Sequence, residues 1–204
     1  NSAHKYNGAI AADLDVDGFQ EIIADGTVFN YDGSIRWRHA FAEGIPAIGD
    51  LDNDSVPEII LCTENFETAW LRVLDIDGNL IWEYGFPERG AGPPTVADFD
   101  GDGLAEIGVA SKNFYYVFEG DGSVLWQQAT QETSSGFTGS SVFDFEGDGA
   151  AEVVYADEKT LWVYDGINSE VELEFTEHSS GTRYEYPTIA DVDGDGSAEI
   201  IVGH

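Results

Sequence analysis

Residues 98–106 read Asp98-Phe99-Asp100-Gly101-Asp102-Gly103-Leu104-Ala105-Glu106, and this acidic stretch decides the fold because the chain repeats it. Carboxylates stand at positions 1, 3, 5 and 9 of the stretch and at the same positions of four similar segments. Those segments are residues 13–21, 50–58, 144–152 and 191–199. Their first residues lie 37 to 48 positions apart, which is typical of a protein built from repeated structural units.

Short strands are predicted on both sides of each acidic stretch. A β-branched run follows it, as in residues 106–109, and a short apolar run such as residues 94–97 precedes it. Farther along each unit, an Asp-Gly turn separates two more apolar runs, which predicts an antiparallel hairpin. Three of these turns are followed by a tryptophan and the fourth is not: Asp32-Gly33 with Trp37, Asp77-Gly78 with Trp82, Asp121-Gly122 with Trp126, and Asp165-Gly166.

No window of helical length shows an apolar stripe with a 3.6-residue period, so we expect an all-β protein. Each unit of about 46 residues supplies four antiparallel strands, the composition of one β-propeller blade. We place one partial propeller domain at residues 1–204, with blades at 8–45, 46–92, 93–137 and 138–185 and half a blade at 186–204. Because the outer strands of the fifth blade are missing, we expect the remainder of the propeller, or another chain, to close the ring.

The order of the strands in a blade determines which loops lie on the same face of the propeller. In an up-and-down blade, the connection from the first to the second strand and the connection from the third to the fourth share one face. The acidic stretches and the Asp-Gly turns should therefore lie together, and the remaining loops should lie on the opposite face. Small residues before the acidic stretches, such as Ala12 and Gly49, suit an innermost strand near the central channel.

The charge balance excludes several classes of function. The 204 residues include 40 acidic and 8 basic side chains, for a formal net charge of −32, which argues against nucleic acid and anionic membrane surfaces as partners. No apolar run is long enough to span a membrane, so we expect no direct membrane insertion. The 26 aromatic residues argue against a disordered acidic tail. We expect the tryptophans to pack between blades and Cys62, the only cysteine, to be a buried thiol.

Four carboxylates in a fixed register make each acidic stretch a predicted cation site. A turn needs only one or two acidic residues, and carboxylates about 4.5 Å apart repel by roughly 3–4 kcal/mol per pair. An all-oxygen ligand set suits calcium better than magnesium, which keeps more of its waters. The predicted ligands are the side chains of Asp13, Asp15, Asp17, Glu21, Asp50, Asp52, Asp54, Glu58, Asp98, Asp100, Asp102, Glu106, Asp144, Glu146, Asp148, Glu152, Asp191, Asp193, Asp195 and Glu199, with the backbone carbonyls of Phe19, Val56, Leu104, Ala150 and Ser197.

We expect up to five calcium ions, one per acidic loop. Glycine at position 6 of four stretches permits the positive φ that reverses the chain. Ser55 replaces this glycine in the second stretch, and Glu146 replaces aspartate at position 3 of the fourth, so the other three loops should bind most tightly. The closing glutamate arrives at position 9 instead of 12 and the flanking segments are strands, so an EF-hand is rejected.

The pattern of residues 97–107, preceded by Pro94-Thr95, resembles the FG-GAP/VCBS repeat family, the β-propellers of the integrin α-chain type. The resemblance extends over nearly the whole chain through its five copies. It implies calcium in each loop between first and second strands, and a disc of usually seven blades, of which this chain holds about four and a half. It also implies that the ions stiffen one face while ligands bind the opposite face.

We expect a secreted or cell-surface module with structural calcium, acting in adhesion or in binding a protein or glycan ligand. No catalytic constellation recurs, so no catalytic residue is predicted and the module should not be an enzyme. The candidate contact surface is formed by residues 86–90, 133–137 and 178–184, which include Arg89, Arg183 and Tyr184. Two alternatives stay open: a polysaccharide lyase of the rhamnogalacturonan lyase type, which has similar acidic loops, and a structural spacer in a surface or filament protein.

Overall fold

The structure is a computed structural model and describes residues 8–24, 26–39, 44–64, 68–132, 138–177 and 186–203. These residues form four four-stranded antiparallel sheets and one two-stranded sheet, and they contain no helix. Accordingly, no described helix is long and apolar enough to cross a lipid bilayer. The predicted all-β fold of four-stranded antiparallel blades is confirmed.

Within each sheet the strands follow one another in chain order. The first sheet contains β1 (Ala9–Ala12), β2 (Glu21–Ala24), β3 (Thr27–Phe29) and β4 (Ile35–Arg38). The second contains β5 (Ile45–Gly49), β6 (Glu58–Glu64), β7 (Ala69–Leu74) and β8 (Leu80–Phe86). The third contains β9 (Thr95–Ala97), β10 (Glu106–Ala110), β11 (Phe114–Phe118) and β12 (Val124–Ala129). The fourth contains β13 (Ser140–Phe143), β14 (Glu152–Ala156), β15 (Leu161–Tyr164) and β16 (Val171–Phe175), and the fifth contains β17 (Thr188–Ala190) and β18 (Glu199–Ile201).

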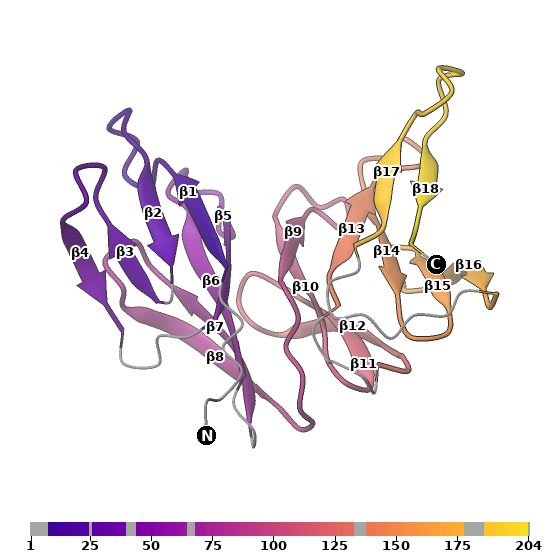
Figure 1. Cartoon of the computed structure of the whole chain (residues 1–204), viewed down its shortest axis with the longest axis horizontal. Coiled ribbons are helices and arrows are strands. Elements are labelled where there is room, and N and C mark those ends of the chain that lie inside the picture. Colours follow the sequence, from indigo (N-terminus) through magenta and orange to yellow (C-terminus); the bar gives the residue numbers. More distant parts are fainter. Residues whose placement is uncertain are drawn as a thin grey trace.

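The first strands of consecutive sheets lie next to one another. Strand β5 contacts β1 and β9, and β13 contacts β9 and β17, so these strands follow one another along an arc (Figure 1). The arc is crowded here, because a Cβ atom added to Gly49 would lie 2.6 Å from Cγ1 of Val96. Within the described residues, the β17–β18 sheet pairs with no strand of the first sheet, so the arc does not close into a ring.

The hydrophobic core lies between consecutive sheets. Between the second and third sheets, for example, Cys62 and Leu71 pack with Ile107 and Val109. Because a sheet covers each of their faces, β10 and β14 are buried throughout, which explains their continuous apolar sequences. Burial also raises the pKa of the Cys62 thiol, as expected for a core cysteine.

Three tryptophans connect one sheet to the next. Each lies on the outermost strand of its sheet, and its indole Nε1–H donates a hydrogen bond to a carbonyl in the Asp-Gly turn of the following sheet. The bonds run from Trp37 to Ile76 (2.8 Å), from Trp82 to Gly120 (2.8 Å) and from Trp126 to Gly166 (2.6 Å). The predicted packing of tryptophans between blades is confirmed for these three. For Trp70 it stays a prediction, since the contact seen for its ring is with Gly85 of its own sheet.

The fourth sheet lacks this connection. Leu173 pairs with Val163 there, at the register where Trp82 pairs with Val73 in the second sheet. Leucine has no N–H donor, so it cannot form the hydrogen bond that the tryptophans form. Leu173 is also exposed, which matches the absence of a tryptophan after Asp165-Gly166 in the sequence.

We predict that Trp126→Phe lowers the free energy of unfolding by about 1–3 kcal/mol, because the Gly166 carbonyl loses its donor. Trp70→Phe is the matched control, since the Trp70 indole donates no hydrogen bond within the described residues. Urea unfolding at constant calcium measures both variants. Equal losses in the two variants would show that the indole hydrogen bond between sheets contributes nothing.

Candidate metal centres

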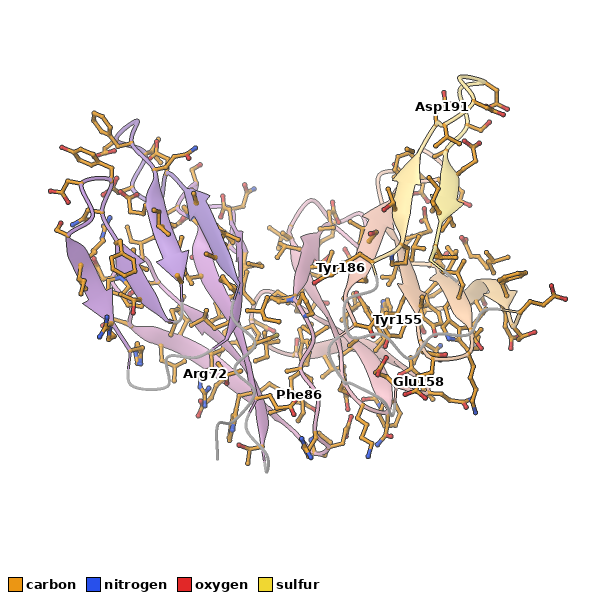
Figure 2. The ribbon with its side chains drawn as sticks, viewed as in Figure 1. Arg72, Phe86, Tyr155, Glu158, Tyr186 and Asp191 are labelled. Carbon is orange, nitrogen blue, oxygen red and sulfur yellow. The ribbon has the colours of Figure 1, made fainter. Side chains whose placement is uncertain are left out.

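The acidic loops connect the first and second strands of the sheets and lie on the same face as the Asp-Gly turns. In the first sheet, Phe19 of the acidic loop stacks on Tyr31 of the turn with ring centroids 4.4 Å apart. In Figure 2, Asp191 marks the loop between β17 and β18, whereas Phe86 and Glu158 lie toward the opposite side. The predicted arrangement of the two faces is therefore confirmed.

Aspartates at positions 1 and 5 hold the loop backbone. In the third loop, Asp98 Oδ2 accepts a hydrogen bond from the Gly103 amide (3.0 Å), and Asp102 Oδ1 accepts one from the Leu104 amide (2.8 Å). Both bonds recur in all five loops. Side-chain oxygens that accept from the backbone two to five residues ahead explain why aspartate occupies these positions.

Left-handed backbone occurs at two positions of each loop. Position 6 has φ between 70° and 98°, as the glycines there predicted, and Ser55 adopts it at 70°. Position 4 is left-handed too, with φ between 57° and 79°, a feature that the sequence reasoning missed although glycine occupies it in three loops. Val16 holds this position in the first loop at 57°, a strained conformation for a β-branched residue.

The closing glutamate at position 9 lies beneath the loop. Its Oε2 accepts a hydrogen bond from the backbone N–H of position 2 in all five loops, at 2.6 Å between Glu106 and Phe99. Glu106 is fully buried, and its Oε1 has no hydrogen-bond partner among the described residues. A buried carboxylate oxygen without a partner is unfavourable, so this atom fits a bound cation.

Carboxylate oxygens converge in four of the five loops. Three oxygens from three residues lie within 4.8 Å of one another in each group. The groups are Asp13, Asp15 and Asp17; Asp50, Asp52 and Glu58; Asp98, Asp100 and Glu106; and Asp191, Asp193 and Glu199. An all-oxygen set at this spacing is chemically suited to a hard divalent ion, and calcium fits it best.

Some predicted ligands lie outside these groups. Position 5 belongs to the group only in the first loop. Asp54, Asp102 and Asp195 lie outside the groups, although they accept the same backbone hydrogen bond as Asp17. Glu21 is absent from the first group, although it accepts the same backbone hydrogen bond as the glutamates of the other groups. The position-7 residues Phe19, Val56, Leu104, Ala150 and Ser197 donate their amides to position 5, and their carbonyls stay predicted ligands.

The fourth loop forms no such group within the described residues. The fourth loop differs from the others at position 3, where Glu146 is one methylene longer than the aspartate of the other loops. Burial, the Glu146 carboxylate and the Glu172 carboxylate all raise the pKa of Glu152, so this loop favours a bound proton. The second loop keeps its group despite Ser55.

Arg36 is a counter-charge in the first loop that the sequence reasoning missed. Its Nη1 lies 2.7 Å from Oδ2 of Asp15. Arg36 directly precedes Trp37 on β4, and successive side chains of a strand point to opposite faces. This alternation could have placed Arg36 beside the acidic loop. A cation that binds this loop competes with the arginine for Asp15.

Burial and crowding make the acidic groups electrostatically unfavourable without a counter-ion. The pKa of Glu106 is raised to about 7, first by burial and then by the carboxylates of Asp100, Glu119 and Asp98. The pKa of Glu58 is raised as well, by burial and by the aspartates of its loop. A divalent ion at these oxygens would remove the repulsion and favour the ionised carboxylates.

A family model described as FG-GAP-like repeat matches residues 98–155 and 144–202. Among curated proteins, no sequence matches the chain. Among solved structures, the V. cholerae biofilm matrix protein Bap1 is similar at 17% identity and a TM-score of 0.79, covering 95% of this chain. The rhamnogalacturonan lyase YesW is similar at 17% identity and a TM-score of 0.66, covering 98% of this chain. An Agrocybe aegerita lectin follows at 16% identity, a TM-score of 0.54 and 98% coverage of this chain.

These structures are longer than the chain, which spans 59% of Bap1, 47% of YesW and 61% of the lectin. Because the identities are low, the likeness concerns the fold alone. It agrees with the four-stranded blades described above.

We predict that calcium-free protein loses stability as the pH rises from about 4.5 to about 7. Folding raises the pKa of Glu106 from 4.5 to about 7, so its contribution to stability is complete below pH 4.5 and is lost as pH approaches 7. Glu106→Gln should flatten this part of the pH profile, as measured by urea unfolding after removal of calcium. Glu177→Gln is the exposed control. An unchanged slope in Glu106→Gln would contradict the assignment.

Proposed function

This chain belongs to the FG-GAP-like repeat family, and we propose that it is a calcium-stabilised β-propeller module that works in adhesion or ligand binding outside the cell. The calcium is structural, with up to five ions, one per acidic loop. The ligand is a protein or a glycan. The fold itself, a partial propeller of FG-GAP-like repeats, is the basis of the proposal.

The convergence of carboxylates in the acidic loops carries the calcium proposal. In each of the four groups, three carboxylate oxygens lie within 4.8 Å of one another. Without a counter-ion, these carboxylates repel one another by roughly 3–4 kcal/mol per pair. The buried, unpartnered Oε1 of Glu106 adds a second reason for a cation at the third loop. The same residues would supply the side-chain ligands, and loop carbonyls and water would complete the shell.

The extracellular setting follows from the same sites. Calcium is scarce in the cytosol and abundant outside the cell, so sites of moderate affinity are filled only outside. A net charge of −32 also favours solubility and limits self-association in such a setting.

We place the ligand on the face opposite the acidic loops. The described part of that surface is residues 86–90, where Arg89 pairs with Glu64 at 3.2 Å while half of its side chain stays exposed. Glu88 accepts hydrogen bonds from Ser111 (2.6 Å) and Tyr116 (3.1 Å), which fixes the loop. The other two candidate loops, residues 133–137 and 178–184, lie outside the described residues.

A non-enzymatic role is part of the proposal. A lyase acting on uronates needs cationic groups free to meet the substrate. Two of the described arginines, Arg36 and Arg72, instead form ion pairs with Asp15 and Glu83. The fold likeness to YesW keeps the lyase alternative testable, and the spacer alternative predicts no ligand at all.

We predict that native protein binds calcium with at least four ions per chain and that Glu146→Asp adds one tight site in the fourth loop. Aspartate restores the position-3 side chain of the loops that form carboxylate groups. Isothermal titration calorimetry counts the sites, and each site should add about 2.7 kcal/mol of stability at a calcium concentration one hundred times its Kd. Glu170→Asp, the same change at an exposed position, should add none. Failure of millimolar calcium to bind or to raise the melting temperature would refute the calcium proposal.

The ligand proposal predicts retention of the calcium-loaded protein on an array of glycans and extracellular proteins. Arg89→Gln should weaken this retention, since it removes an exposed cation from the candidate face. The same sample incubated with pectin fragments should release no unsaturated products. Appearance of such products would establish the lyase alternative, whereas an array without any retained ligand would favour the spacer.

A further inference from the structure

A cavity of about 780 Å³ lies between the second and third sheets, on the face of the acidic loops. Its walls come from five segments: the second acidic loop, β7, β8, the third acidic loop and the Asp-Gly turn between β11 and β12. The hydrogen bond from Trp82 to Gly120 ties two of these walls together. The volume is typical of a pocket for an organic ligand and is far larger than one metal ion requires.

The charged side chains that line the cavity are all anionic, and Ser123 is the one neutral polar side chain among the described lining residues. Asp52, Glu58, Glu119 and Asp121 line it, and no lysine, arginine or histidine does. Calcium in the second loop would engage Asp52 and Glu58, which belong to its carboxylate group. Glu119 and Asp121 belong to none of the four carboxylate groups, and neither forms an ion pair within the described residues; Asp121 accepts hydrogen bonds from Ser123.

Glu119 is the unusual member of this pair. At the equivalent turn position of the second sheet, Asp75 accepts hydrogen bonds from the Asp77 and Asn79 amides. The longer Glu119 side chain accepts no hydrogen bond and forms no ion pair within the described part of the chain. In the calcium-free protein, burial and the carboxylates of Asp100, Asp102 and Asp121 raise the pKa of Glu119.

The rest of the cavity is apolar. Ile81 and Leu104 line it from opposite sheets and are 53% and 40% exposed, while Leu51 and Val73 are buried. The three ion-paired arginines described above bind carboxylates outside the cavity lining, so they do not supply its missing positive charge.

We propose that this cavity binds a lysine-bearing segment of a partner protein. The aliphatic parts of the segment lie on Ile81 and Leu104, and its ammonium groups meet Glu119 and Asp121. Two unneutralised carboxylates beside an apolar wall are complementary to two cations carried on apolar stems. The site lies on the acidic-loop face, so it is separate from the ligand surface proposed above.

The test uses the whole chain at saturating calcium and physiological salt. The probe is a fluorescein-labelled pentapeptide of alternating lysine and leucine, and the same peptide with acetylated lysines is the neutral comparison. Fluorescence anisotropy should show binding of the charged peptide only. Glu119→Gln should raise its Kd about tenfold, the loss expected for one charge-assisted hydrogen bond. Ile81→Ala should also weaken binding, because it removes apolar contact.

Glu177→Gln is the matched control, since it removes one negative charge from an exposed site after β16. Equal weakening by Glu119→Gln and Glu177→Gln would mean general attraction to an acidic surface and would overturn the proposal. Displacement of the peptide by 1,5-diaminopentane with equal affinity would assign the cavity to a free diamine and overturn the protein partner. Calcium-dependent melting of each variant, compared with native protein, separates damage to the acidic loops from loss of the peptide site.

Discussion

The glutamate that closes each acidic stretch, buried in four of the five, is the constraint on which the rest of the blade depends. One oxygen of Glu106 holds the amide of Phe99, and Phe99 in turn is fully buried against the neighbouring sheet. The other oxygen faces no protein donor within the described residues. The Glu106 side chain therefore connects the interior of the propeller to the cluster of carboxylates above it. An ion bound to that cluster would be linked to the core through Glu106 and its hydrogen bond with Phe99.

The five loops meet this constraint with different counter-charges. The first has an arginine, Arg36, paired with Asp15. The second, third and fifth bring three carboxylates together and have no basic partner among the described residues, which is the arrangement that most needs a metal ion. In the fourth, the buried Glu152 interacts with the exposed Glu146 carboxylate and its pKa is raised, so a proton is the nearest substitute. Loops with the same spacing of carboxylates in the sequence thus differ in their counter-charge: an arginine, a metal ion or a proton.

Sequence reasoning predicted what the local register determines. The four-stranded units, the shared face of loops and turns, and the three tryptophan contacts all follow from motifs that recur within one unit. What it missed depends on side chains from separate segments: the Arg36 ion pair, the free carboxylate of Glu119 and the cavity between sheets. The left-handed position 4 was missed for another reason, since Val16 and Asn53 obscure the glycine found there in the other loops. Metal binding and ligand identity stay predictions, because no periodicity specifies an affinity.

The corner between the third and fourth sheets explains how an irregular loop is accommodated. The Ala151 amide donates to the Asp98 carbonyl at 3.0 Å, so the fourth loop is bonded directly to the third. Gly166 is packed so tightly against the Phe99 and Ala151 carbonyls that any larger residue would collide with both. Trp126 then fixes Gly166 from the other side. A loop bonded to its neighbour depends less on an ion of its own, and an ion held by Asp98 in the third loop would stiffen the fourth through this backbone contact.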